Sequence, residues 1–182
     1  GQPKTNAIAE RQVQELINGT RTLLSQAGLP ASFWPYAMRA WAFCHNTETR
    51  QGRKTPWKIR HGKDFTGPNI PFGSLVYYKP SPISKKPRKG PRDTRRLRSK
   101  FQDGTSTGIF LGYKTLTGGR WKNEYLVIDL RDLAFQNFWK GAKNWTKNCH
   151  IQTVREIPTS VPKFFPCRED YDKANATLEG IR

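Results

Sequence analysis

The chain has 182 residues, with 32 Lys and Arg against 14 Asp and Glu, which gives a formal net charge of +18. Aromatic residues make up 12% of the sequence, too many for a disordered polycation. No run approaches the ~18 apolar residues of a membrane span, and the N-terminus has no signal-peptide pattern. We therefore expect a folded protein whose basic surface binds a polyanion, nucleic acid ahead of a membrane surface. The alternative is that the charge serves solubility alone.

The three cysteines, Cys44, Cys149 and Cys167, are far apart and odd in number. This pattern argues against a disulfide framework and for a reducing compartment, so we expect a nuclear or particle-associated intracellular protein rather than a secreted one. The pairs Cys44-His45 and Cys149-His150 have the wrong internal spacing for a structural zinc site, and core packing explains Cys44 better. The first residue is not Met, and we expect the chain to be a piece of a longer protein.

Apolar side chains recur at three- and four-residue steps between Asn6 and Gln26, which predicts an amphipathic helix. Gly28 stands where a left-handed C-terminal cap belongs, and Pro30 prevents the helix from continuing. With the apolar stripe centred on Val13, Glu10 is expected at the border between the core and the solvent. A carboxylate in the first turns is favoured by the helix dipole.

A second helix is predicted from Ser32, as its N-cap, to about Asn46, with Pro35 tolerated in the first turn. The short connection between the two helices predicts a helical hairpin. Residues 47–72 are rich in Gly and Pro and are expected to form a linker with one helical turn near Pro56–His61.

Short β-strands are expected after the linker, at a spacing that suggests a small antiparallel barrel. The apolar run Gly108–Tyr113 is bounded by Gly and predicts a buried strand, and Leu116–Lys122 predicts a hairpin turn. The tail from Pro158 onward is Pro-rich and then polar, and it is expected to be loosely held. The other expected strands are Ser74–Tyr78, Glu124–Leu130 and Asn148–Val154.

The segment Lys79–Lys100, between the first two strands, contains ten cations and one acid, Asp93, for a net charge of +9. Prolines keep the segment extended, and a barrel would hold both of its ends in place. We therefore predict that it binds a polyanion, with a solvated loop as the alternative and a nuclear-import role as an addition. The candidate nucleic-acid-binding residues are Lys85, Lys86, Arg88, Lys89, Arg92, Arg95, Arg96, Arg98 and Lys100.

Tryptophan and lysine are interleaved between residues 121 and 147. Such a pattern is typical of surfaces that stack on nucleic-acid bases and neutralise phosphates, but it fits a barrel core with flanking charge equally well. Both interpretations stay open at this point. The residues are Trp121, Trp139 and Trp145 with Lys122, Lys140, Lys143 and Lys147.

A series of short motifs runs along the chain in a fixed order. The motifs are Asn6-Ala7-Ile8-Ala9-Glu10-Arg11, Arg21-Thr22-Leu23-Leu24, Ala27-Gly28-Leu29-Pro30, Phe33-Trp34-Pro35-Tyr36-Ala37, Asn46, Thr55-Pro56, His61-Gly62, Phe72-Gly73, Val76-Tyr77-Tyr78 and Gly108-Ile109-Phe110-Leu111-Gly112-Tyr113. Over roughly residues 1–157, this series resembles the integrase of copia-type retrotransposons. A single motif of this kind is weak, whereas the series in the expected order is specific.

The resemblance implies an α+β chain made of two parts, and their boundaries can be given in the numbering of this sequence. Residues 1–60 would be the C-terminal helical part of an RNase H-like catalytic core, and 61–72 a linker. Residues 73–157 would be an SH3-like barrel with the basic loop 79–100, followed by the loosely ordered tail 158–182.

The resemblance also implies a chemistry. Glu10 matches the Glu of the family's catalytic and metal-binding set of two Asp and one Glu, and the two Asp would lie upstream of Gly1. The parent enzyme would use Mg²⁺ or Mn²⁺ to join element ends to host DNA. The fragment alone is expected to be inactive, since one carboxylate cannot hold two metal ions.

DNA, as element ends and host target, is the expected partner, and RNA and a second copy of the chain stay open. The alternative function is a non-catalytic basic module that binds nucleic acid, and a third possibility is an eroded copy of the element.

Overall fold

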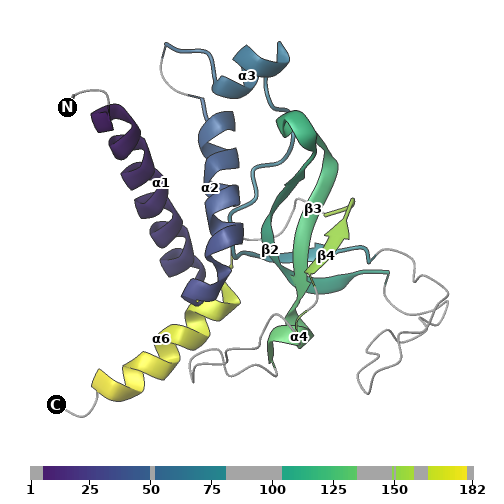
Figure 1. Ribbon diagram of the computed structural model, residues 1–182. Coiled ribbons are helices and arrows are strands. Elements are labelled where there is room, and N and C mark those ends of the chain that lie inside the picture. Colours follow the sequence, from purple (N-terminus) through teal and green to yellow (C-terminus); the bar gives the residue numbers. More distant parts are fainter. Residues whose placement is uncertain are drawn as a thin grey trace.

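The computed structural model describes residues 6–49, 52–80, 104–134, 149, 151–157 and 164–179. These residues form helices and one antiparallel sheet, which confirms the α+β class expected from the sequence (Figure 1). The helical elements are α1 (Asn6–Ala27), η1 (Ala31–Phe33), α2 (Trp34–Thr47), α3 (Pro56–His61), η2 (Thr117–Gly119), α4 (Leu130–Ala134) and α6 (Pro166–Glu179). The strands are β1 (Leu75–Tyr78), β2 (Ser106–Thr115), β3 (Trp121–Asp129) and β4 (Ile151–Val154).

Helices α1 and α2 form the predicted hairpin, and Gly28 ends α1 as expected. Gly28 has a φ of 65°, and the Leu29 N–H donates to the carbonyl oxygen of Leu24 at 3.1 Å. The expected N-cap at Ser32 is wrong, because the chain tightens into η1 directly after Pro30. The Phe33 N–H donates to the Pro30 carbonyl at 3.0 Å, so Ser32 lies inside a helical turn rather than before one.

The first half of α1 is exposed, so the prediction that its apolar stripe faces a core is wrong for this half. Every residue from Asn6 to Glu15 is exposed, and Val13, the expected centre of the stripe, is 51% exposed. Burial begins near Leu16, and the second half of the helix packs against α2. The contact between the two helices is close at Gly19, where an added Cβ would clash with the indole of Trp41.

The four strands pair in chain order, β1-β2-β3-β4, and all pairs are antiparallel. The predicted hairpin turn between β2 and β3 is present, with the Leu116 N–H donating to the Arg120 carbonyl at 2.7 Å. Register shifts after Phe110 and after Tyr113 bend the β2–β3 ribbon, and Gly112 allows the bend with a φ of 128°.

The sheet is open, so the small barrel expected from the sequence is not closed in the described residues. Strands β1 and β4 form its two edges and are not paired as strands. Two hydrogen bonds nevertheless connect the edges. The Lys79 N–H donates to the Glu156 carbonyl at 3.3 Å, and the Gln152 amide donates to the Tyr78 hydroxyl at 3.1 Å. The sheet therefore curls until its edges meet at one point.

Both faces of β2 are buried, as the apolar run predicted. Ile109 and Leu111 belong to a cluster that includes Phe33, Ala37 and Ala40, so the helical hairpin covers this face of the sheet. The opposite face bears a second, aromatic cluster, which includes Phe43 of α2, so helical residues pack into both clusters. The buried members of that cluster are Phe43, Ile70, Val76, Tyr78, Phe110, Tyr113, Tyr125, Val127, Val154 and Ile157.

The segment that we expected to be loosely held contains α6, which lies against the end of α1 (Figure 1). The Leu75 N–H donates to the Phe164 carbonyl at 2.7 Å, and the Arg168 guanidinium donates to the Ser25 carbonyl at 2.9 Å. Cys167 packs partly buried against the helix–sheet cluster. Helix α6 begins at Pro166, a residue that is favoured in the first turn of a helix. The polar composition of the tail gave no other signal for this helix. Among the described helices, none is long and apolar enough to cross a membrane.

Candidate nucleic-acid interface

The base of the cationic segment lies at the junction of two paired strands. Tyr78, the last residue of β1, is the register partner of Ser106 in β2, so the chain leaves and re-enters the sheet at neighbouring positions. Lys79 is additionally held by Glu156, through the backbone hydrogen bond and through an ion pair of 3.3 Å. The first residue of the segment is thus tied to the fold. The nine candidate residues between Lys85 and Lys100 lie outside the described residues.

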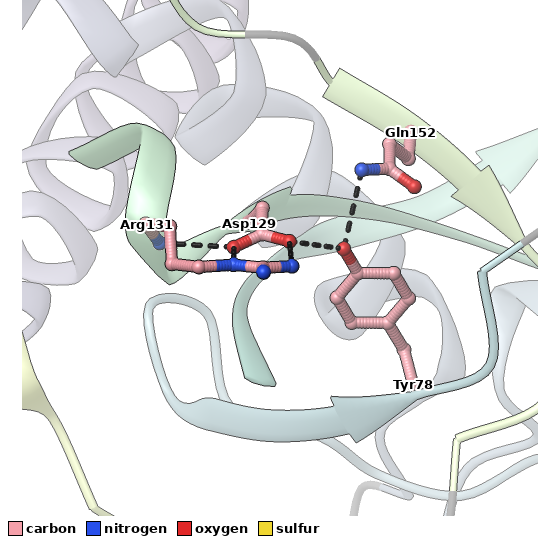
Figure 2. Close-up of polar contacts among 4 residues, drawn as sticks. All are labelled: Tyr78, Asp129, Arg131 and Gln152. Atoms are coloured by element: carbon pink, nitrogen blue, oxygen red, sulfur yellow. Dashed lines mark hydrogen bonds and ion pairs between the residues drawn. The ribbon is translucent and has the colours of Figure 1, made fainter. Parts of the chain in front are cut away.

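Four side chains form a polar network directly beneath this junction (Figure 2). The Tyr78 hydroxyl donates to Asp129 Oδ2 at 3.0 Å and accepts from the Gln152 amide. Arg131 donates to the same carboxylate from its backbone N–H at 2.9 Å, from Nε at 3.1 Å and from Nη2 at 3.0 Å. The network joins both edge strands to the end of β3, and it therefore stabilises the curl of the sheet.

The electrostatics of this network keep Asp129 ionised. Burial disfavours its charged form, but the hydrogen bonds from Arg131 and Tyr78 outweigh burial and hold the pKa of Asp129 below its usual range. Burial, together with the negative charge of Asp129, raises the pKa of Tyr78, which stays a neutral donor. Because Asp129 accepts four hydrogen bonds, its oxygens are committed to the fold and do not form an open ligand site.

Trp121, one of the tryptophans with two open interpretations, is partly buried and packs against the aromatic cluster. Its ring lies 5.1 Å from Phe65, 5.8 Å from Tyr113 and 5.4 Å from Tyr125, measured between centroids. Its Nε1 donates to the Glu124 carbonyl at 2.8 Å. The indole is therefore partly buried, with its ring packed against the aromatic cluster and its N–H hydrogen-bonded, which favours the packing interpretation. Trp139 and Trp145 lie outside the described residues.

Glu10 is exposed in the second turn of α1, among residues that are all exposed. Within the described ranges, no group of three His, Cys, Asp or Glu side chains is arranged to hold a metal ion. A single exposed carboxylate does not fit a two-metal centre by itself, so we derive no catalytic step from this chain. Cys44 is half-buried against the aromatic cluster, in agreement with the packing role expected for it.

The network at Asp129 was missed from the sequence, although one signal was available. Asp129 directly precedes the short helix α4, and its carboxylate accepts from the N–H two residues later, as a helix-capping Asp does. The partners Tyr78 and Gln152 come from other strands, and only the fold brings them together.

Comparison with protein-family models, curated proteins and solved structures found no match to this chain.

Proposed function

We propose that the chain binds nucleic acid through the cationic segment 79–100, as the C-terminal part of a copia-type retrotransposon integrase. The observation that supports this most directly is a dense run of positive charge that begins at a residue tied to the fold. Ten cations and one acid occupy 22 residues whose first residue is tied to the sheet by Glu156. Each phosphate that these cations neutralise releases counterions, which gives affinity together with a strong salt dependence.

The order of the motifs along the chain supports the proposal of an integrase. Several residues of these motifs also have identifiable structural roles. Gly28 ends α1, Thr55 caps α3, and Gly73 has a φ of 80° at a position where a side chain would strike Ala27. We propose that residues 73–157 correspond to an SH3-like unit. Its curled four-stranded sheet, with the edges joined at Lys79, supports this proposal.

In the parent protein, Glu10 would be one of three carboxylates of a metal-dependent polynucleotidyl transferase. We expect the 182-residue chain alone to lack strand-transfer activity, because it offers one carboxylate of that set. Mg²⁺-dependent joining of DNA ends by the purified chain would contradict this expectation. A non-catalytic binding module is the second candidate, and the packing of the helical hairpin and the sheet into a common cluster favours it.

A salt titration of duplex binding tests the proposal. The variant with Lys85, Lys86, Arg88 and Lys89 replaced by Gln should flatten the dependence of log affinity on log salt. The expected change is roughly 0.9 per lost phosphate contact. The matched control keeps all four charges by exchanging Lys for Arg and Arg for Lys at the same positions, and it should retain the wild-type slope. An unchanged slope in the Gln variant would show that these four cations do not touch the DNA backbone.

A further inference from the structure

Helix α3 lies beside the turn between β2 and β3 (Figure 1), and both segments are rich in cations. Residues 52–66 contain five Lys and Arg and one acid, residues 114–124 contain three and one, and the combined net charge is +6. The two segments are distant in sequence but adjacent in space. Nη1 of Arg60 lies 3.6 Å from the position of a Cβ on Gly119, and the Phe65 and Trp121 ring centroids are 5.1 Å apart.

Acidic side chains neutralise only part of this charge. Lys58 pairs with Asp64 at 2.7 Å, and Lys114 pairs with Glu124 at 3.3 Å. The remaining exposed cations make no ion pair within the described parts of the chain. We define four of them as the α3–turn surface: Arg60, Lys63, Arg120 and Lys122.

The α3 side of this surface is held rigidly. The Lys58 N–H donates to the side chain of Thr55 at 3.0 Å, and Gly62 ends the helix in the left-handed region with a φ of 77°. Trp57 anchors the helix to the core, with its ring centroid 5.6 Å from Phe43 and 5.3 Å from Phe65. A six-residue helix would be unstable alone, so these contacts fix the direction in which it presents its cations.

The turn side is equally well defined. The Leu116 N–H donates to the Arg120 carbonyl at 2.7 Å, and the Gly119 N–H donates to the Leu116 carbonyl at 2.9 Å. Gly118 and Gly119 have φ values of 80° and 74°, which a residue with a side chain rarely adopts. Cations on two fixed backbones lose less conformational freedom on binding than cations on a flexible one.

We propose that the α3–turn surface is a second contact site for the phosphodiester backbone of a nucleic acid, additional to segment 79–100. This inference rests on the proposed function and deepens it. Arginine binds phosphate oxygens in a two-pronged geometry, and a duplex offers one charge per ~1.7 Å, so several fixed cations can be engaged at once. An acidic protein fits less well, because the core of a protein interface is aromatic, whereas Trp57, Phe65 and Trp121 are partly buried against the aromatic cluster of this chain.

The test compares the salt dependence of duplex DNA binding between wild type and the variant Arg60→Gln, Lys63→Gln, Arg120→Gln. Three lost phosphate contacts should reduce the slope of log affinity against log salt by up to about 2.7. A charge-keeping variant, Arg60→Lys, Lys63→Arg, Arg120→Lys, should retain the wild-type slope. This variant changes the side chain of Arg60, which lies against the turn, without removing its charge, so it separates the effect of charge from the effect of packing. Circular dichroism and thermal melting establish that each variant is folded.

A charge-matched control removes three exposed arginines from α1 and α2, by Arg11→Gln, Arg21→Gln and Arg39→Gln. This control should leave the slope within a few tenths of wild type. An equal loss in the control and in the α3–turn variant would mean that total charge, not this surface, sets affinity, and would overturn the inference.

The outcomes separate the two proposals. Absence of wild-type binding to any duplex would overturn the proposed function and this inference together. Wild-type binding that weakens in the 79–100 variant but keeps its slope in the α3–turn variant would overturn this inference alone. Duplex RNA tested beside DNA shows which nucleic acid supplies the phosphodiester backbone. Tighter binding of polyglutamate than of either duplex would refute the surface as a nucleic-acid site and favour an acidic protein.

Discussion

Replacement of Asp129 by Ala should destabilise the fold by about 2–4 kcal/mol. The largest contribution comes from the Tyr78 hydroxyl, because Tyr78 is only 1% exposed and its hydroxyl would lose the acceptor of its hydrogen bond. A buried donor without an acceptor costs about 1–3 kcal/mol. Loss of the cap on α4 adds about 1 kcal/mol. The Arg131 side chain is 67% exposed, so its ion pair contributes at most a few tenths of a kcal/mol, in line with the ~0–1 kcal/mol of exposed pairs.

Urea and thermal unfolding measure this change, and a chain of this size should lose roughly 2–4 °C in melting temperature per kcal/mol. The matched control is Asp64→Ala, which removes an exposed pair with Lys58 and should cost less than about 1 kcal/mol. The variant Tyr78→Phe removes the orphaned donor, so the double variant should be less destabilised than the sum of the single variants. Equal, small effects of Asp129→Ala and Asp64→Ala would refute the reasoning.

The pH dependence of the same variant gives an independent check. The folded-state pKa of Asp129 is depressed, so its stabilisation is fully present above the unfolded pKa of about 4 and is lost as the pH falls through the lower folded value. The stability difference between wild type and Asp129→Ala should therefore be constant from pH 5 to 7, which is above the pKa in both states, and should shrink in stronger acid. A difference that does not shrink in acid would show that the charge of Asp129 contributes nothing.

Three further predictions follow from single positions. A Cβ at Gly108 would lie 2.6 Å from the Ile128 carbonyl oxygen, so Gly108→Ala should cost roughly 1–3 kcal/mol in urea unfolding, whereas Gly104→Ala, in open space, should be near neutral. Thr55→Ala should cost about 1 kcal/mol by removing the α3 cap, and Thr55→Ser should recover most of it. Burial raises the pKa of Cys167 to about 12, so iodoacetamide at neutral pH should label its thiol far more slowly in the native than in the unfolded chain; equal rates would contradict its burial.

Local signals in the sequence predicted the helices and strands well where periodicity and turn residues agree. The cap at Gly28, the helical turn Pro56–His61 and the buried run Gly108–Tyr113 all follow from residues within a few positions of each other. Helix α6 was missed because its polar composition has little apolar periodicity. Its contacts include the hydrogen bond from Arg168 to the Ser25 carbonyl of α1 and the packing of Cys167 against the helix–sheet cluster. The exposure of α1 before Leu16 was missed because periodicity identifies an apolar face but not what covers it.

The candidate sites also differ in whether their residues are close together in the sequence. The cationic segment is contiguous, so its charge is visible in the sequence. Tyr78, Asp129 and Gln152, by contrast, are brought together only by the pairing of four strands. The α3–turn surface could not be predicted from the sequence either, since only the fold brings Arg60 next to Gly119 and Phe65 next to Trp121.

The two cationic regions differ in a way that bears on how a nucleic acid would be held. Segment 79–100 contains more charge, and its first residue is tied to Glu156. The α3–turn surface contains fewer cations, on a helix and a turn that the core fixes in place. Long-range attraction depends on total charge, whereas the orientation of a bound duplex depends on donors whose positions are fixed before binding. We therefore expect the segment to dominate the association rate and the α3–turn surface to dominate the dissociation rate. Stopped-flow measurements on the two Gln variants would refute this division if both variants changed the same rate constant.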